Sequence, residues 1–221
     1  MNYEELSYYN LIGGTGLSIH LEHRLSEDID LFCYNPSYPG KRFPLPNKDL
    51  ILDRFKNDFD SIHYILNETQ DVTLILNDVK VQLRSEHQFH GPKKASKLGY
   101  INHPSSKDLL GMKIVALYLR NTWRDVYDLT CLANKFNLTE FYPAYESIMS
   151  SKYCGSKARK PKLFNDAISK LKDQNLLTSL HTSDPMNHLI TQSHITPSDV
   201  INTFTPLELI PIQQQNRGFS M

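Results

Sequence analysis

Two carboxylates in one short apolar segment, Asp28 and Asp30, are the residues of this sequence best placed to do chemistry. They alternate with Ile29 and Leu31, a pattern that predicts a strand with both carboxylates on one face. Their side chains would start about 6–7 Å apart, so both could reach one or two hard divalent cations, which prefer oxygen ligands. A lone pair of this kind is more often a solvated strand end, so its interpretation depends on its surroundings.

A second cluster precedes the carboxylates. Gly13, Gly14 and Thr15 end a short apolar run and open a predicted helix that reaches to about residue 22, and Arg24 and Ser26 follow it. A glycine turn that enters a helix offers free backbone N–H groups and a positive dipole end to a phosphate. Together the two clusters could hold a metal–nucleoside triphosphate, with amides on the phosphates and carboxylates on the metal. Taken alone, a Gly-Gly pair is usually a turn.

Lys113 lies in the middle of an apolar helical stripe, between Leu109 and Leu117. The helix is expected to begin after Ser105, which forms a capping box with Asp108. A lysine in such a stripe is at least partly buried and then needs an anion, either a carboxylate or a ligand phosphate. The alternative is a lysine at the stripe edge whose ammonium group reaches water.

A second charged helix is expected from about residue 123 to 134. Asp125 and Asp128 share one of its faces, and Arg124 and Asp128 are spaced to pair, with Arg120 just ahead. The ordinary interpretation is a surface ladder of ion pairs, which contributes little to stability.

The remaining pattern predicts an α/β (α+β) fold, with a small mixed sheet flanked by helices and then a C-terminal helical bundle. The Asn77-Asp78 pair predicts a hairpin, and residues 87–104 are interpreted as a polar, turn-rich connection. The expected strands are 28–32, 61–66, 72–76 and 79–83, and a helix is expected over 48–59 with Leu50, Ile51, Phe55 and Phe59 inward. The expected domains are a core at 1–104, a helical region at 105–205 that completes the site, and a poorly packed tail at 206–221.

Composition excludes several classes of protein. The chain has 221 residues, of which 40% are apolar and 22% charged, a globular composition without a stretch of about 18 apolar residues that could span a membrane. Its three cysteines and its acidic start favour a cytoplasmic protein without a disulfide framework. Residues 1–90 carry 8 basic and 14 acidic side chains, whereas the remainder carries 16 and 10. Lys93, Lys94 and Lys97, together with the basic segment 152–162 and its Tyr153, are candidate contacts for an RNA backbone, although solvated loops explain them equally well.

Taken in order, the blocks GGTGLSIHLEHRLSEDIDLF, VKV, LLGMK and RNTWRDVYDL resemble the nucleotidyltransferase toxins of abortive-infection systems, the AbiEii/AbiGii family of the DNA polymerase β-like superfamily. The resemblance covers roughly residues 10–135. It implies a Mg²⁺-dependent (or Mn²⁺-dependent) transfer of a nucleotide from an NTP, with RNA, in particular the tRNA acceptor end, as the target in some members. It also implies a bacterial toxin–antitoxin setting with a separately encoded antitoxin.

The resemblance assigns roles to the clustered residues. Asp28 and Asp30 would be catalytic metal ligands, Lys113 would neutralise the triphosphate, and Asp125 would orient or deprotonate the acceptor. The expected nucleotide-binding residues are Gly13, Gly14, Thr15, Arg24, Ser26, Lys113, Arg120, Arg124 and Asp128.

Two departures from the family pattern stand out. The block that usually supplies the third carboxylate reads Lys80-Val81-Gln82, and an amide cannot take a proton from an attacking hydroxyl group. Glu86 would face the same side of a continued strand, but about 13 Å further on. The helix that usually precedes the Gly-Gly turn is also expected to be short or absent.

Three functions therefore remain open. The first is an active nucleotidyltransferase toxin that modifies RNA or protein. The second is a catalytically weakened NTP- or RNA-binding regulatory protein, in which Gln82 has ended turnover. The third is a phosphotransferase that uses the same metal site with another acceptor.

Overall fold

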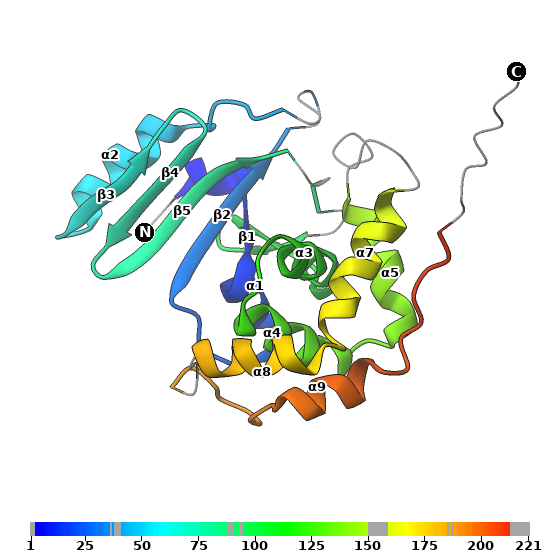
Figure 1. Cartoon of the computed structure of the whole chain (residues 1–221). Coiled ribbons are helices and arrows are strands. Elements are labelled where there is room, and N and C mark those ends of the chain that lie inside the picture. The colour runs from blue at the N-terminus through cyan, green and yellow to red at the C-terminus, as the bar shows by residue number, and fades with distance from the viewer. Residues whose placement is uncertain are drawn as a thin grey trace, which may run out of the picture.

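The computed structural model describes residues 3–35, 37, 41–87, 91–92, 95–149, 159–184, 186 and 188–212. Within these residues the chain forms a seven-stranded sheet of order β3-β4-β5-β2-β1-β7-β6 with helices on both faces (Figure 1). The strands are β1 Tyr9–Ile12, β2 Asp28–Tyr34, β3 Ile62–Asn67, β4 Asp71–Leu76, β5 Val79–Glu86, β6 Ala95–Leu98 and β7 Ile101–Pro104. The helices are α1 Gly13–Leu21, α2 Lys48–Asp58, α3 Ser106–Leu119, α4 Trp123–Ala133, α5 Phe141–Ile148, α7 Arg159–Lys170, α8 Gln174–Ser183 and α9 Pro197–Phe204. The expected mixed α/β class is confirmed.

The sheet is mixed in direction. β2 runs antiparallel to β1 and parallel to β5, and β1 runs parallel to β7. The β3–β4 and β4–β5 pairs are antiparallel, and Asn77 and Asp78 close the β4–β5 hairpin with φ values of 43° and 71°. Two consecutive left-handed residues suit the tight turn that matches the twist of a hairpin, so the sequence signal at this pair is confirmed.

Alternation along β2 gives the sheet two different faces. Leu31 and Cys33 pack with Ile51 and Phe55 of α2, whereas Phe32 packs into the helical core around α3. Figure 1 shows α2 on the outer face of the sheet and the other helices on the opposite side. Leu50, expected to point inward, is 61% exposed, and Leu52 is buried instead. Leu52 and Ile51 lie three and four residues before Phe55 and so share its inner face of the helix.

Helix α3 is the centre of the helical part. It contacts α1, α4, α5 and α7, and its side chains are buried nearly all round, as expected of a helix surrounded by other elements. Gly111 allows the closest approach, because a Cβ atom there would lie 2.5 Å from the carbonyl oxygen of Ala144 in α5. Ser105 caps the helix by accepting from the backbone N–H of Asp108 at 3.1 Å, which confirms the N-cap half of the expected capping box. The Asp108 carboxylate accepts from the Ser105 hydroxyl at 2.8 Å.

Two expectations about the connecting regions and the tail need correction. Residues 95–98 and 101–104 are not a plain connection but form the β6–β7 hairpin, which turns at Gly99 with φ 60°. Helix α9 lies within the expected helical region 105–205, and Thr196 and Asp199 form a capping box around Pro197 at its start. Leu207, assigned to a poorly packed tail, is only 8% exposed, since it joins the core cluster that contains Phe204. Residues 213–221 lie outside the described part of the chain.

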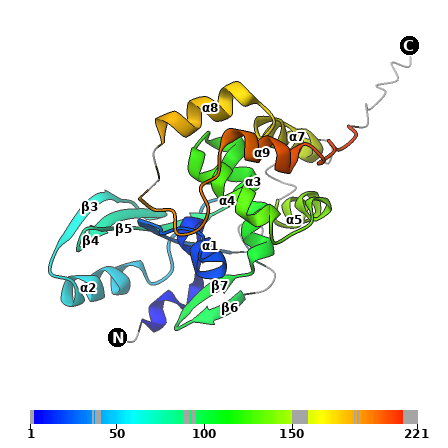
Figure 2. The same ribbon diagram turned by 90° about the horizontal axis from the view of Figure 1, so that it is seen from below.

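Figure 2, seen from below, shows α1 between the sheet and the α3–α4 pair, with the β6–β7 hairpin beside it. Gly13, the first residue of α1, follows β1 directly and lies against Asp30 of β2. None of the helices in the described ranges is both long and apolar enough to cross a membrane.

Candidate active site

The backbone of the Gly13-Gly14 turn faces the strand carboxylates directly. β1 ends at Ile12 and α1 begins at Gly13, whose φ of 69° favours glycine. A Cβ atom at Gly13 would collide with the carboxylate of Asp30, and one at Gly14 would collide with the guanidinium group of Arg24 and lie 3.0 Å from Ser26 Oγ. Both glycines are therefore required by the close approach of functional side chains to the start of this helix.

Asp28 and Asp30 lie on the inner face of the sheet, as their spacing predicts. Burial and the neighbouring Asp28 raise the pKa of Asp30 above its ordinary value. Asp28 is more exposed and pairs with Lys80 of β5, whose Nζ lies 3.3 Å from Asp28 Oδ2. Two carboxylates held close together at a partly buried site are costly without a cation, so this oxygen donor set fits a hard divalent metal.

Gln82 stands directly opposite Asp30 in the parallel pairing of β2 with β5. Its amide nitrogen donates to Asp71 Oδ1 of β4 at 3.1 Å, and Asp71 is also paired with Arg84 at 3.4 Å. An ionised carboxylate only accepts hydrogen bonds, which fixes the NH₂ group of Gln82 on the β4 side. The amide oxygen is therefore not the atom that faces Asp71, and Gln82 lines both pockets that meet at Asp30.

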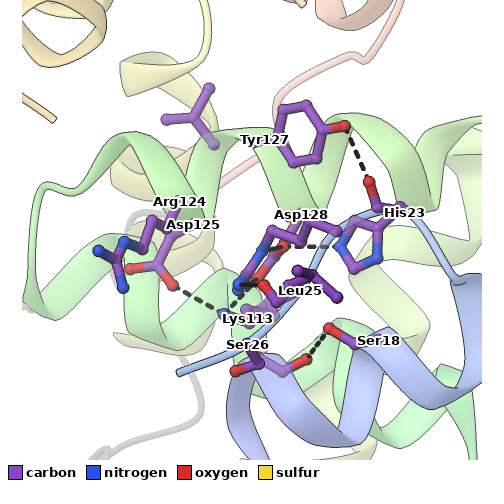
Figure 3. Close-up of polar contacts among 12 residues, drawn as sticks. Ser18, His23, Leu25, Ser26, Lys113, Arg124, Asp125, Tyr127 and Asp128 are labelled. Carbon is purple, nitrogen blue, oxygen red and sulfur yellow. Dashed lines mark hydrogen bonds and ion pairs between the residues drawn. The ribbon is translucent and has the colours of Figure 1, made fainter. Parts of the chain in front are cut away.

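A buried ion-pair network joins α3, α4 and the loop after α1 (Figure 3). Asp128 accepts from Lys113 at 2.6 Å, from Arg24 at 2.7 and 2.9 Å, and from His23 at 2.7 Å. Lys113 Nζ is also 3.0 Å from Asp125, and Asp125 and Asp128 are both 0% exposed. The expected surface ladder is thus wrong for this pair, because Arg24 and Lys113 from other elements cover it.

These contacts set the protonation states. Burial alone would lower the pKa of Lys113, but Asp128 and Asp125 outweigh it and raise the pKa. Burial alone would raise the pKa of both Asp128 and Asp125. Lys113 and Arg24 instead hold the pKa of Asp128 below its ordinary value. Lys113 and Arg120 do the same for Asp125. All three side chains are therefore charged at neutral pH, and Asp125 is a weak proton acceptor.

Arg120 and Arg124 occupy different places around this network. Arg120 follows the end of α3, reaches Asp125 with bonds of 2.8 and 3.1 Å, and keeps 60% of its side chain exposed. Arg124 does not pair with Asp128 as expected: it points to the rim, where it lies 3.0 Å from Glu27 and 3.6 Å from Asp184. The reason is that Asp128 is on the buried face of α4 and is already saturated by Lys113 and Arg24.

Two cavities meet at Asp30. The polar pocket, of about 370 Å³, is lined mainly by polar and charged groups, and the α3–β5 pocket, of about 240 Å³, lies between those two elements. Asp30, Gln82, Lys113 and Arg120 line both. The remaining residues of the polar pocket are Gly14, Arg24, Ser26, Asp28, Lys80, Thr122, Arg124 and Asp184.

The sequence prediction located most of these groups. Thr15 is at the first turn of α1, where its hydroxyl donates to the carbonyl oxygen of Asp28 and so fixes the strand. Lys80, Asp71, Thr122, Glu27 and Asp184 were not selected as site residues. Lys80 sits in the recognised Lys-Val-Gln block, whereas Asp71 carries no local signal because its role depends on the pairing of two strands.

The candidate RNA contacts are only partly described. Lys97 lies on the exposed edge strand β6, and residues 159–162 form the first turn of α7. Lys160 Nζ donates to the carbonyl oxygen of Met149 at 2.8 Å, so it has a structural partner. Lys93, Lys94 and Tyr153 lie outside the described residues.

Comparison with known families decides the relationship. The model of the family described as "Nucleotidyl transferase AbiEii toxin, Type IV TA system" matches residues 7–98 and 87–192. The chain belongs to this AbiEii family. The match spans both pockets and the buried network, and the resemblance inferred from the sequence blocks is confirmed.

Individual relatives are distant. The chain is 28% identical to an uncharacterized protein, aq_aa25, of Aquifex aeolicus (strain VF5). The match extends over 150 residues and covers 66% of each protein. It thus spans slightly less than two thirds of the length of that relative. Among solved structures, MenT4, a nucleotidyltransferase toxin from Mycobacterium tuberculosis H37Rv, is similar with a TM-score of 0.48 and 12% identity, over 92% of this chain and 80% of that one.

Proposed function

We propose that this AbiEii-family chain is a metal-dependent nucleotidyltransferase that acts as a toxin and transfers a nucleotide from an NTP to RNA. The observation that carries the proposal is the convergence of the Gly13-Gly14 backbone with Asp30. The Gly13-Gly14 turn at the start of α1 places backbone N–H groups, which suit a phosphate, next to Asp30. The carboxylate of Asp30 in turn suits a divalent cation. Its toxic effect would be controlled by a cognate antitoxin.

Each group has a distinct part in this proposal. Gly13, Gly14 and Thr15 present the start of α1 to the phosphates, and Arg24 and Ser26 border them in the polar pocket. Asp28 and Asp30 would hold Mg²⁺ or Mn²⁺, which supplies charge neutralisation on the reacting phosphate when bound. Lys113, Arg120 and Arg124 keep the pocket cationic and so favour the departing pyrophosphate.

Asp125 and Asp128 act through the cations that they hold. Asp128 has no exposed surface and orients Lys113 and Arg24, so we assign it positioning rather than contact with the nucleotide. Asp125 orients Lys113 and Arg120 in the same way. In the reaction, an acceptor hydroxyl oxygen bonds to the α-phosphorus, the bond to pyrophosphate breaks, and the hydroxyl proton passes to water.

The structure bears on the alternative in which Gln82 has ended turnover. Nucleotidyl transfer depends mainly on positioning and on charge stabilisation, and needs little help from a strong base. The hydrogen bond to Asp71 orients Gln82, which lines the pocket beside Asp30, and an amide oxygen there can serve as a neutral ligand to a hard cation. We therefore favour an active enzyme over a binding protein.

The test is incorporation of label from each of four α-labelled NTPs into total bacterial RNA with Mg²⁺. The expected result is a labelled RNA that is reduced roughly a hundredfold or more in Asp30→Asn and is unchanged in Asp53→Asn, a control in which an exposed carboxylate of α2 is neutralised. Label in RNA that is equal in wild type and Asp30→Asn would contradict the proposal. Transfer from γ-labelled but not α-labelled NTP would instead identify a phosphotransferase.

A further inference from the structure

The outer face of the sheet carries an apolar groove that the proposed reaction does not use. It has a volume of about 330 Å³ and lies between α2, the short 3₁₀ helix Glu4–Tyr8 and strands of the sheet. Ile29, Val81 and Ile101 line it from the strands, and Phe59, directly after α2, lines it from the helix side. Figure 2 shows the 3₁₀ helix between α2 and the β6–β7 hairpin, so a helix of five residues covers the sheet there.

Apolar side chains at this outer groove remain open to solvent. Val79 lines the groove and is 39% exposed. Leu98, the direct cross-strand partner of Ile101 in the β6–β7 hairpin, is 46% exposed. Ile29 and Phe59 are only half-buried. Apolar side chains that gather around a groove in this way mark an interaction site, whereas scattered ones do not.

The outer groove is separate from the active site, although both use β2. Ile29 and Leu31 line the groove, whereas Asp28 and Asp30 alternate with them and line the polar pocket on the other face of the sheet. A ligand in the groove therefore leaves the polar pocket open.

Carboxylates border the outer groove. Asp58 accepts from the hydroxyl group of Tyr3, a lining residue, at 2.8 Å. Asp60 and Asp78 are direct chain neighbours of other lining residues. All three carboxylates are exposed, and none forms an ion pair with a residue that the structure describes. Cations near this rim are already paired with other carboxylates. The pairs are Arg54 with Glu5, Lys56 with Asp53 and Lys80 with Asp28.

An apolar groove with an acidic rim selects one kind of occupant. A second copy of the chain, bound symmetrically, would bring its own acidic rim against this one, and like charges so placed repel. The rim would also repel the anionic surface of a membrane. An amphipathic helix with cations beside its apolar stripe complements both parts, because such helices bind apolar grooves through side chains at i, i+3, i+4 and i+7.

We propose that the outer groove is the docking site for a protein partner that presents a basic amphipathic helix. The apolar stripe of this helix lies against Ile29 and Val79, and its lysines or arginines lie against Asp58, Asp60 and Asp78. The inference does not depend on the proposed function, because the groove and the two active-site pockets are on opposite faces of β2.

The probe is a fluorescein-labelled peptide of leucine and lysine, about 18 residues long, with its leucines on one face of the helix. Fluorescence anisotropy should show saturable binding to the full chain. A peptide with glutamate in place of every lysine should bind roughly tenfold more weakly or worse. Absence of saturable binding, or equal affinity for the two peptides, would overturn the proposal.

Val79→Ser tests the apolar part of the groove, and Ile65→Ser is its matched control. Both replace an exposed β-branched residue of a strand, but Ile65, which is 56% exposed, lies on β3 and does not line the groove. Val79→Ser should weaken binding of the leucine–lysine peptide roughly fivefold, because it removes apolar area that the helix would cover. Ile65→Ser should bind like the wild type. Equal affinities of the two variants would overturn the proposal.

The acidic rim is tested by combining Asp60→Asn with Asp78→Asn. Asparagine tolerates the φ of 71° at position 78. Asp49→Asn combined with Glu68→Gln removes the same charge at the other end of α2, beside a different cavity. The rim variant should weaken peptide binding and reduce its dependence on salt, and the control should change neither. Identical behaviour of the two variants would show unspecific attraction and overturn the proposal.

Two further measurements identify the other occupants. A wild-type dimer in analytical ultracentrifugation that Val79→Ser abolishes would assign the groove to a second copy. Binding to vesicles of phosphatidylcholine and phosphatidylglycerol that Val79→Ser abolishes would assign it to a membrane surface. Either result would overturn the docking of a basic helix, whereas a monomer that ignores the vesicles supports it.

Discussion

At the scale of single residues, Gln82 stands where the family pattern has a carboxylate, and the neighbouring strand β4 carries a carboxylate, Asp71, that binds its amide group. Asp71 is 5% exposed and accepts from Gln82 while pairing with Arg84. A carboxylate at position 82 would face Asp71 at about the same distance and would repel it. The amide and the acid are therefore a matched pair, and neither can be understood from its own position in the sequence.

Gln82→Glu, which restores a carboxylate at this position, is expected to lower nucleotide incorporation and stability rather than raise them. A half-buried carboxylate at position 82 and the buried Asp71 would compete for Arg84, and the cost falls in the roughly 1–3 kcal/mol range of disrupted buried polar groups. Adding Asp71→Asn should recover part of both losses. The measurements are label incorporation and urea unfolding of the two single variants and the double variant. A single Gln82→Glu variant with higher activity than wild type would contradict the pairing.

Asp30 makes stability depend on pH in a predictable direction. Its pKa is raised in the folded protein, chiefly by burial and then by Asp28, so its ionised form destabilises the metal-free fold. This cost is absent at pH below the ordinary carboxyl pKa and present in full above the raised pKa. Asp30→Asn should therefore stabilise the metal-free protein at pH 7 and have little effect near pH 3. Thermal unfolding at both pH values checks this, and a destabilised variant at pH 7 would contradict it.

At the scale of elements, two buried carboxylates of α4 dock three segments of the chain. Asp128 holds Lys113 of α3 and Arg24 of the loop before β2, and Asp125 holds Lys113 and Arg120. Asp125 is itself fixed by Thr122, whose hydroxyl donates to it at 2.8 Å and caps α4. These two carboxylates thus fix the positions of Arg24, Lys113 and Arg120, which line the pockets.

Asp128→Asn is expected to cost about 3–5 kcal/mol of unfolding free energy, because it leaves Lys113 and Arg24 as poorly compensated buried cations. Glu140→Gln is the control: it breaks the exposed ion pair with Lys107, which contributes about 1 kcal/mol or less. Chemical denaturation of both variants provides the comparison. Equal losses in the two variants would show that the buried network does not hold α4 in place.

The element scale also shows where sequence reasoning succeeds and fails. The Gly13 turn, the strand with Asp28 and Asp30, and the Ser105 cap were predictable because each depends on a local pattern. The β6–β7 hairpin was missed because β6 is exposed at all four positions and shows no alternation. Arg124 was expected to pair within its own helix, but partners from distant segments had already saturated Asp128. Local spacing could not show which helix face is buried.

At the scale of the whole molecule, residues 189–191 return to the loop that carries Arg24 into the polar pocket. Ile190 forms an isolated bridge with Arg24, Leu25 N donates to the carbonyl oxygen of Leu189 at 2.7 Å, and Thr191 N donates to that of His23 at 3.2 Å. Tyr127 of α4 donates to the same His23 carbonyl. The loop that carries Arg24 into the polar pocket is therefore held on both sides, by α4 and by residues 189–191.

Leu189 anchors this returning segment, since it is 4% exposed and belongs to the helical core. Leu189→Ala should cost about 2–5 kcal/mol and also release the backbone bond to Leu25, so amide hydrogen exchange should accelerate selectively at Leu25 and Thr191. Leu177→Ala, a fully buried position of α8, provides a control with a similar global loss. Equal exchange at Leu25 in the two variants would contradict a specific clamp. Faster exchange in Leu189→Ala together with weaker NTP binding would show that the C-terminal segment keeps Arg24 in the pocket.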